Sequence, residues 1–170
     1  NVLRGKKFQV FSTEDIIGAE LAGALKNIVA LGSGILGGMG MGKNIQAMLI
    51  TRGLTEMINY GKAMGSTAKP FLGIASIGDL VATATSKKSR NYTFGYRIGQ
   101  GEAPEDIFGS MPELAEGART LKIARGLARH YKLHVPITEM LYNVVFEGFD
   151  KKRALYYLMK YPYAVDVDFL

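Results

Sequence analysis

Cysteine is absent from this sequence of 170 residues, and histidine and proline are scarce, with two and five residues. Without cysteine the chain forms no disulfide, and it is long enough to bury a hydrophobic core that needs none. The sequence also lacks a charged and then apolar leader, and it has no uninterrupted apolar run of membrane length. We therefore expect a soluble protein of the reducing cytoplasm that does not insert into a membrane.

An initial methionine is also absent, since Asn1 leads directly into the basic run Arg4-Gly5-Lys6-Lys7. This start is typical of a fragment or a processed product whose true N-terminus lies elsewhere. No internal repeat or low-complexity linker divides the rest, so the length predicts one folded domain. The net charge of +6 favours anionic partners but does not choose among phosphate esters, nucleotides and nucleic acids.

Apolar residues recur at helical spacing along most of the chain. The first helix is expected from Asp15 to about Gly37, after a capping-box-like start at Ser12-Thr13-Glu14-Asp15. Phe8-Gln9-Val10-Phe11 alternates like one short strand, which cannot form a sheet alone. The pattern predicts a compact all-α domain with a short N-terminal strand remnant. Its further helices are expected at Asn44 to Met64, Ala103 to Met111, Glu116 to Tyr131, Pro136 to Glu147 and, after the cap Asp150, up to Lys160.

Lys26 lies in a stripe of small side chains on the first expected helix. Its neighbours three, four and seven positions away are Ala19, Ala22, Gly23, Ala30 and Ser33. A lysine in such a stripe sits over a hollow, whereas a solvated lysine usually has polar neighbours at these spacings. A lysine that snorkels to the surface along its aliphatic stem is the alternative.

The stretch from Gly78 to Gly95 carries most of the polar chemistry. If its first part is helical, Asp79 and Thr83 stand four residues apart on one face, so a carboxylate and a hydroxyl point the same way. The loop from Ser86 to Asn91 then offers hydroxyl, ammonium, guanidinium and amide groups before the next helix. That set suits a small phosphorylated ligand, and the alternative is an ordinary solvated basic loop.

The run Gly32-Ser33-Gly34-Ile35-Leu36-Gly37 matches the G-x-G-x-x-G pattern of dinucleotide-binding turns. That turn requires a preceding strand, a following helix and a second strand with an acid about 20 residues on. Here a long helix follows, with Glu56 in its middle. We predict that these glycines instead permit close helix packing and then a flexible turn from Gly37 to Gly42.

Six short blocks, none decisive alone, together carry a specific resemblance to a known family. They are Ile17-Gly18-Ala19-Glu20-Leu21-Ala22-Gly23-Ala24-Leu25-Lys26-Asn27, Gly42-Lys43-Asn44 through Thr51-Arg52-Gly53-Leu54-Thr55-Glu56-Met57, Gly78-Asp79-Leu80, Ser89-Arg90-Asn91, Glu116-Gly117 and Val135-Pro136-Ile137-Thr138-Glu139. In order and approximate spacing over nearly the whole chain, they resemble the C-terminal domain of NAD(P)-dependent glycerol-3-phosphate dehydrogenases.

The resemblance implies a helical domain like the C-terminal domain of 6-phosphogluconate dehydrogenase. This domain would form the substrate side of an oxidoreductase that interconverts glycerol 3-phosphate and dihydroxyacetone phosphate with NAD or NADP. Residues 1–13 would be the end of a Rossmann domain and a linker, and residues 14–170 the helical catalytic domain. The Rossmann domain would bind most of the cofactor and lie upstream of Asn1, so we expect the isolated chain to be inactive. A second copy of the chain is a further expected partner.

The resemblance also implies roles for individual residues. Lys26 is the proton acceptor, since oxidation of an alcohol by hydride loss requires removal of its hydroxyl proton. Arg90 and Asn91 would grip the substrate phosphate, and Asp79 would orient Lys26 and the substrate hydroxyl. The substrate-contact positions are Lys26, Asp79, Thr83, Ser89, Arg90 and Asn91, and the cofactor-contact positions are Arg90, Leu114 and Glu116.

A basic all-α module that binds nucleic acid or a protein is the competing interpretation. Such a module predicts a basic stripe along one helix with aromatic or amide residues that reach bases. The lysines and arginines of this chain are instead spread over loops and several helices. No metal site is expected, because His130 and His134 bracket the end of a predicted helix without a nearby acidic cluster.

Overall fold

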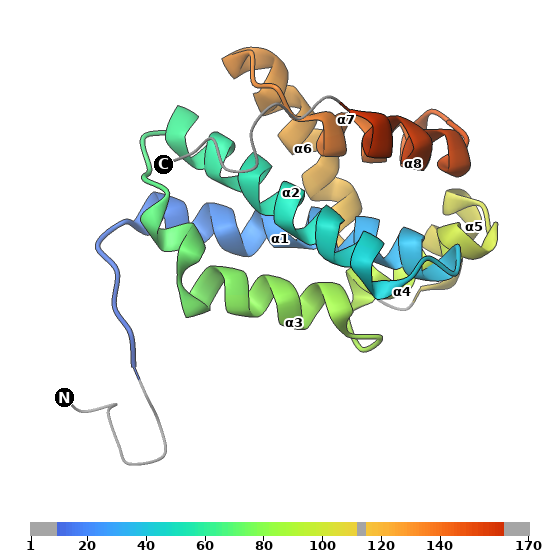
Figure 1. Ribbon diagram of the computed structural model, residues 1–170, viewed down its shortest axis with the longest axis horizontal. Helices are drawn as coiled ribbons and strands as arrows, with labels where there is room; N and C mark the ends of the chain where they lie inside the picture. The colour runs from blue at the N-terminus through green and yellow to red at the C-terminus, as the bar shows by residue number, and fades with distance from the viewer. Residues whose placement is uncertain (1–9, 112–114, 162–170) are drawn as a thin grey trace.

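The computed structural model describes residues 10–111 and 115–161. Within those ranges every regular element is a helix, which confirms the predicted all-α domain (Figure 1). Of the expected strand, Phe8 and Gln9 lie outside the described residues, and Val10 and Phe11 adopt no regular structure. In chain order the elements are α1 (Ile16–Gly38), α2 (Lys43–Ala63), the 3-10 helix η1 (Lys69–Leu72), the π-helix η2 (Ile74–Gly78), α3 (Asp79–Thr85), α4 (Arg90–Gln100), α5 (Pro104–Ser110), α6 (Glu116–Tyr131), α7 (Pro136–Phe146) and α8 (Lys151–Lys160).

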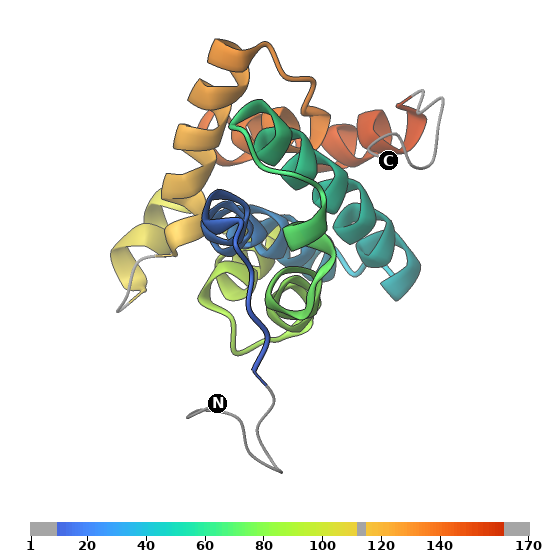
Figure 2. The same ribbon diagram turned by 90° about the vertical axis from the view of Figure 1, so that its left-hand side faces the viewer.

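Helix α1 forms the centre of the domain, with α2, α3, α4 and α6 arranged around it (Figure 2). Every residue from Asn27 to Leu36 is buried, because this half of α1 is apolar or small on all sides. By length and composition α1 resembles a membrane span, but 67% of its most apolar window is buried inside the domain. We therefore describe α1 as the core helix, with Leu31 packed in the same cluster as Ile58 of α2 and Leu121 of α6.

The start of α1 is held by Asp15, the last residue of the predicted capping sequence. One carboxylate oxygen accepts a hydrogen bond from the backbone N–H of Gly18 at 2.9 Å. The other accepts from the N–H of Thr67 at 3.0 Å and from the hydroxyl of Ser66 at 2.8 Å. The hydrogen bonds from the N–H groups of Thr67 and Gly18 lower the pKa of Asp15. The same side chain thus caps α1 and ties it to the loop after α2.

Glycines bring α1 and α4 into direct backbone contact. A Cβ atom added at Gly34 would lie 2.1 Å from the carbonyl oxygen of Tyr92, and one added at Gly95 would lie 2.0 Å from that of Leu31. Gly38 and Gly99 meet in the same way one helical turn further on. The glycine-rich run is therefore a helix-packing surface, as predicted. We call this line of glycine contacts between α1 and α4 the glycine seam. The turn predicted from Gly37 begins one residue later, because α1 remains helical to Gly38, the last α1 residue of the seam.

Glu56 is buried in the middle of α2 and closes the start of α7. Its carboxylate accepts hydrogen bonds from the backbone N–H groups of Ile137 at 2.5 Å and Thr138 at 3.0 Å, and from the Thr138 hydroxyl at 2.7 Å. These N–H groups belong to the first turn of α7, where no partner exists within the helix. Burial raises the pKa of Glu56 to about 7, against the opposing effect of the three donors. The sequence placed Glu56 in a helix but did not predict this capping role.

Candidate active site

Lys26 and Asp79 form an ion pair between the centre of α1 and the first residue of α3. Lys26 Nζ donates a hydrogen bond to Asp79 Oδ2. The lysine side chain is 20% exposed and the aspartate side chain 44%, so the pair lies at the edge of the core and is open to a ligand. The π-helix η2 runs directly into α3 at this point, and such π segments are frequent at functional sites.

Thr83 joins this pair from the next turn of α3. Its hydroxyl donates a hydrogen bond to the second oxygen of Asp79, Oδ1, at 3.2 Å. The spacing of four residues brings the two side chains to one face of α3, as predicted from the sequence. One oxygen of Asp79 is therefore held by Lys26 and the other by Thr83.

The polar loop expected from Ser86 to Asn91 is shorter in the structure, because α4 already begins at Arg90. Ser89 is the N-cap of α4, and its hydroxyl oxygen accepts a hydrogen bond from the N–H of Tyr92 at 3.3 Å. Arg90 lies exposed in the first turn of α4. Arg90 is thus the first residue of a helix whose start favours anions.

Asn91 is buried and hydrogen-bonded on both sides of its amide. Its Nδ2 donates to Asn27 Oδ1 at 2.9 Å, and its Oδ1 accepts from the backbone N–H of Gly117 at 2.7 Å. The three residues belong to α4, α1 and α6, so one side chain joins the three helices. Glu116, the first residue of α6, lies exposed beside this junction, whereas Leu114 lies outside the described residues.

Asn27 received no role from the sequence, although it follows Lys26 directly. The residue is only 9% exposed, and the buried residues on either side of it, Leu25 and Ile28, are apolar. A buried amide requires hydrogen-bond partners. The single asparagine within Leu25 to Leu31 is therefore the sequence signal from which a buried partner for Asn27 could have been predicted. The partner itself lies 64 residues away and could not be read from that signal.

The face of α1 next to Lys26 is open. No atom lies within 4 Å of where a Cβ atom of Gly23 would stand, one turn before the lysine. Three of the five small residues around Lys26 are buried, so the open part of this face is at Gly23. The exposed Arg90 and Glu116 at two helix starts supply donors and acceptors that suit the phosphates and hydroxyls of a nucleotide. The described residues thus fit a nicotinamide nucleotide that reaches the site from outside the domain.

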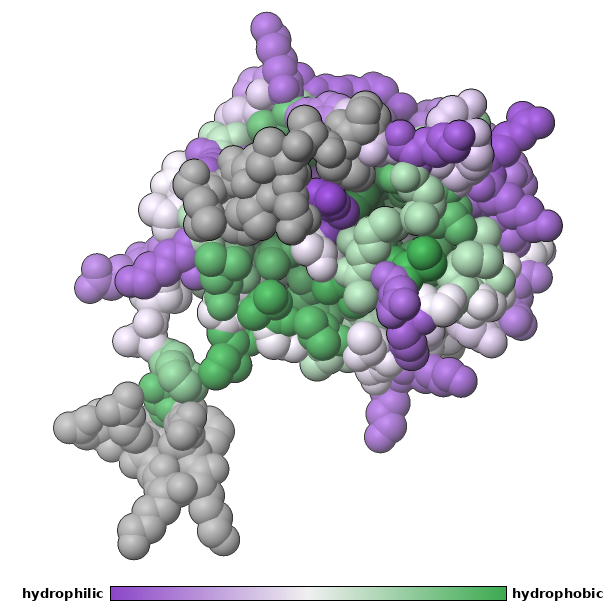
Figure 3. Space-filling model, viewed as in Figure 1, coloured by the Kyte–Doolittle hydropathy of each residue, from purple (hydrophilic) through white to green (hydrophobic). Residues whose placement is uncertain are grey.

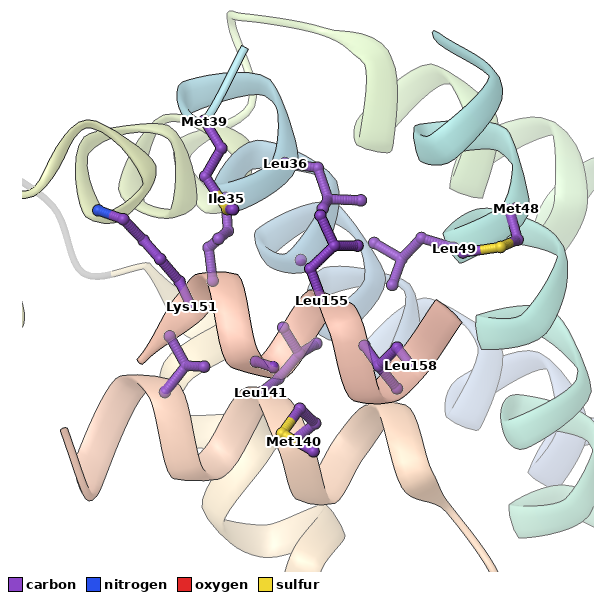
Figure 4. Close-up of a pocket in the computed structure, with 13 residues that line it drawn as sticks. Ile35, Leu36, Met39, Met48, Leu49, Met140, Leu141, Lys151, Leu155 and Leu158 are labelled. Carbon is purple, nitrogen blue, oxygen red and sulfur yellow. The ribbon is translucent and has the colours of Figure 1, made fainter. Parts of the chain in front are cut away.

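The described residues also form an apolar hollow away from Lys26. Figure 4 shows this hollow between α1, α2, α7 and α8, lined by leucine and methionine side chains such as Leu49, Met140 and Leu155. Its lysine, Lys151, donates to the carbonyl oxygen of Ile98 at 2.9 Å, with its ammonium group away from the apolar side chains (Figure 4). Among the described residues, no three His, Cys, Asp or Glu side chains are arranged to hold a metal ion.

Apolar side chains also gather on the face formed by α2, η2 and α3 (Figure 3). A groove there is lined by Ile50, Leu54, Ile77 and Val81, and Val81 is 45% exposed. This face carries no cluster of titratable groups like that at Lys26. The candidate active site is therefore the cluster of Lys26, Asp79 and Thr83 together with the starts of α4 and α6.

Comparison with known proteins identifies relatives of this chain. The sequence model described as NAD-dependent glycerol-3-phosphate dehydrogenase C-terminus matches residues 15–156. A glycerol-3-phosphate dehydrogenase [NAD(P)+] of Limosilactobacillus reuteri is 47% identical over 152 residues, which cover 89% of this chain and 45% of that protein. The Pseudomonas putida enzyme of the same name is 40% identical over 169 residues, 99% of this chain and 50% of that protein.

A solved structure agrees with these relatives. The crystal structure of glycerol-3-phosphate dehydrogenase from Coxiella burnetii matches with a TM-score of 0.87 and 35% identity, over 93% of this chain and 49% of that one. The chain spans about half the length of the curated relatives it matches. Because the family match covers most of the chain, the chain belongs to the family of NAD-dependent glycerol-3-phosphate dehydrogenase C-terminal domains.

Proposed function

We propose that this chain is the substrate-side half of an oxidoreductase of glycerophospholipid metabolism that interconverts glycerol 3-phosphate and dihydroxyacetone phosphate with NAD or NADP. The observation that carries the proposal is the ion pair of Lys26 with Asp79, which lies open beside the start of α4. The family match supports it, since the relatives are named for this activity.

Lys26 is the proposed general base. In the oxidation direction, the Lys26 amine takes the proton of the secondary hydroxyl while the carbon loses hydride, and in the reverse direction the ammonium returns that proton to the developing alkoxide. When bound, the nicotinamide nucleotide supplies the hydride acceptor or donor. Asp79 orients the Lys26 amine through Oδ2, and Thr83 holds the carboxylate through Oδ1.

The start of α4 is the proposed phosphate site. Arg90 presents a planar guanidinium that can bind two phosphate oxygens at once. Ser89 retains its hydroxyl hydrogen, because its oxygen acts as the acceptor in the helix cap. Asn91 retains one amide hydrogen after its bond to Asn27. A phosphate anchored here uses binding energy to hold the reacting carbon near Lys26.

The cofactor is proposed to be bound mainly by a Rossmann domain, with Arg90, Leu114 and Glu116 contributing from this chain. Residues 1–13 are then the end of that domain and a linker, and residues 14–170 the catalytic domain. The relatives support this division, since the chain matches about half of their length. The exposed apolar side chains Phe11, Leu72 and Ile74, which line a hollow next to the first described residues, support a neighbouring domain on that side.

A second copy of the chain and a cytoplasmic location remain further parts of the proposal, the latter supported by the absence of cysteine. The competing nucleic-acid function is not adopted. The candidate site groups an amine, a carboxylate and a hydroxyl, whereas nucleic-acid binding calls for a basic stripe interleaved with aromatic side chains.

The test of the proposed function is Lys26→Met in the two-domain protein. Methionine keeps most of the side-chain length but cannot carry a proton, so kcat for dihydroxyacetone phosphate should fall by roughly 10² or more, as is typical for loss of a general acid or base. NADH oxidation measures the rate, and circular dichroism checks that the helices remain. A variant with near-normal kcat would remove Lys26 from the mechanism.

A further inference from the structure

We propose that Asn27 is a positioning residue for the phosphate site, and that it acts by fixing the orientation of the Asn91 amide. The inference rests on the proposed function, because it concerns the same substrate phosphate. Asn27 touches neither the substrate nor Lys26 Nζ in this scheme. Its contribution reaches the ligand only through Asn91.

The orientation of the Asn91 amide follows from a backbone group that can only donate. The N–H of Gly117 lies 2.7 Å from one end of the amide, so that end must be the oxygen, Oδ1. The other end is then the nitrogen, Nδ2, and it faces the side chain of Asn27 at 2.9 Å. The Asn27 atom at this contact must accept, so it is Oδ1. Each amide is thereby set in one of its two orientations.

This arrangement leaves one hydrogen of Asn91 Nδ2 for a ligand. An amide nitrogen carries two hydrogens, and the bond to Asn27 uses one. Asn91 lies in the first turn of α4, next to Arg90 and two residues after the cap Ser89. The remaining hydrogen therefore belongs to a helix start that already favours anions.

Without the Asn27 acceptor, the Asn91 amide keeps the hydrogen bond from Gly117 to Oδ1 but loses the partner of Nδ2. With one contact in place of two, the amide can turn about Oδ1, and Nδ2 is no longer held in one direction. The surrounding space is tight: a Cβ atom added at Gly117 would lie 2.7 Å from the Asn27 carbonyl oxygen and 2.9 Å from Asn91 Oδ1. Loss of the hydrogen bond therefore disturbs the amide itself, while close packing holds the three helices together.

The test uses Asn27→Leu in the two-domain protein, with dihydroxyacetone phosphate and unphosphorylated dihydroxyacetone as substrates. Leucine has a similar volume but no acceptor. We expect the KM for dihydroxyacetone phosphate to rise by about tenfold or more, as for loss of a hydrogen bond to a charged group. The kcat/KM for unphosphorylated dihydroxyacetone should change by less than about threefold, because that substrate has no phosphate to grip.

A double-mutant cycle distinguishes positioning from general packing. In an Asn91→Ala background, Asn27→Leu should change the KM for dihydroxyacetone phosphate by less than about threefold, since Asn27 acts through Asn91. Gln46→Leu is the matched control: this buried amide of α2 contacts Lys43, near the far end of α1 from Lys26. It should leave the KM for both substrates unchanged.

Asn27→Ser is the second variant, in case leucine prevents folding. Its shorter hydroxyl cannot reach Nδ2 of Asn91, so the same rise in KM for dihydroxyacetone phosphate is expected. An unchanged KM, an equal loss with both substrates, or independent effects of Asn27 and Asn91 would each overturn the positioning role. If the wild-type protein does not turn over dihydroxyacetone phosphate at all, the proposed function fails and this inference with it. An active wild type with a normal Asn27→Leu variant refutes only the inference.

Discussion

Gly95→Ala should separate the two helices that carry the candidate active site. The added methyl group would lie 2.0 Å from the carbonyl oxygen of Leu31, in the middle of α1. That oxygen belongs to the backbone of a buried helix and cannot rotate away, so α4 must move by about 1 Å to restore an ordinary contact. The same shift would weaken the contact of Gly99 with Gly38, one turn along the seam.

The expected cost is a balance of two effects. Overpacking of this kind costs about 1–3 kcal/mol, and a contact with backbone favours the upper part of that range. Alanine recovers up to about 1 kcal/mol, because it is a better helix former than glycine. A net loss of about 2 kcal/mol in the free energy of unfolding corresponds to a fall in Tm of about 4–8 °C for a chain of this size.

Thermal unfolding followed by circular dichroism measures this loss on the 170-residue chain. Gly126→Ala in α6 is the matched control, because it lies exposed with no atom within 4 Å of the added Cβ position. The control should raise the Tm slightly through helix propensity alone. If Gly95→Ala were as stable as the control, α1 and α4 would not be in backbone contact at Gly95, which would refute the glycine-mediated packing of these helices.

Three further predictions follow from single residues and from the domain as a whole. Burial raises the pKa of Glu56 from 4.5 to about 7, so its contribution to the free energy of unfolding is full below pH 4.5 and is lost as the pH rises through 7, by about 3 kcal/mol in all. Urea unfolding from pH 4 to 8 should therefore show a steeper loss of stability in the wild type than in Glu56→Gln. Parallel curves would contradict the raised pKa. Arg90→Lys in the two-domain protein should raise the KM for dihydroxyacetone phosphate, because a point charge cannot bind two phosphate oxygens as a guanidinium does. Equal KM values for the two proteins would exclude a contact between the Arg90 guanidinium and the substrate phosphate. The 170-residue chain alone should give a helical circular dichroism spectrum but should not oxidise NADH, since hydride transfer needs a domain that holds the nicotinamide. Measurable turnover would show that the chain binds a dinucleotide by itself.

Local patterns predicted the elements of this domain well. The apolar spacing of α1 is in the structure, and the predicted span of α6, Glu116 to Tyr131, agrees at both ends. The predicted capping sequence ends at Asp15, and in the structure Asp15 itself is the N-cap. These features depend on residues within a few turns of one another, which a single sequence displays directly. The π-helix η2 was not predicted, because no local pattern distinguishes a π turn from the α-helix that continues it.

The parts that were missed depend on contacts between distant segments. Glu56 was placed in the middle of a helix, but its partners Ile137 and Thr138 lie 81 and 82 residues away. Asn91 was predicted to face a ligand, and the structure adds Asn27 and Gly117 as its partners inside the protein. Spacing indicates which side chains share a face of one helix, but not which second helix covers that face.

The glycine seam explains why the site residues meet at all. Backbone contact through Gly34 and Gly95 brings α4 closer to α1 than larger side chains would permit, because the backbone of the facing helix occupies the space where a Cβ atom would stand. Only at that separation does the short side chain of Asn91 span from α4 to Asn27 on α1, next to Lys26. The glycine pattern that resembles a nucleotide-binding turn therefore serves the candidate active site differently, by setting the distance between the helix that carries the proposed base and the helix that begins the proposed phosphate site.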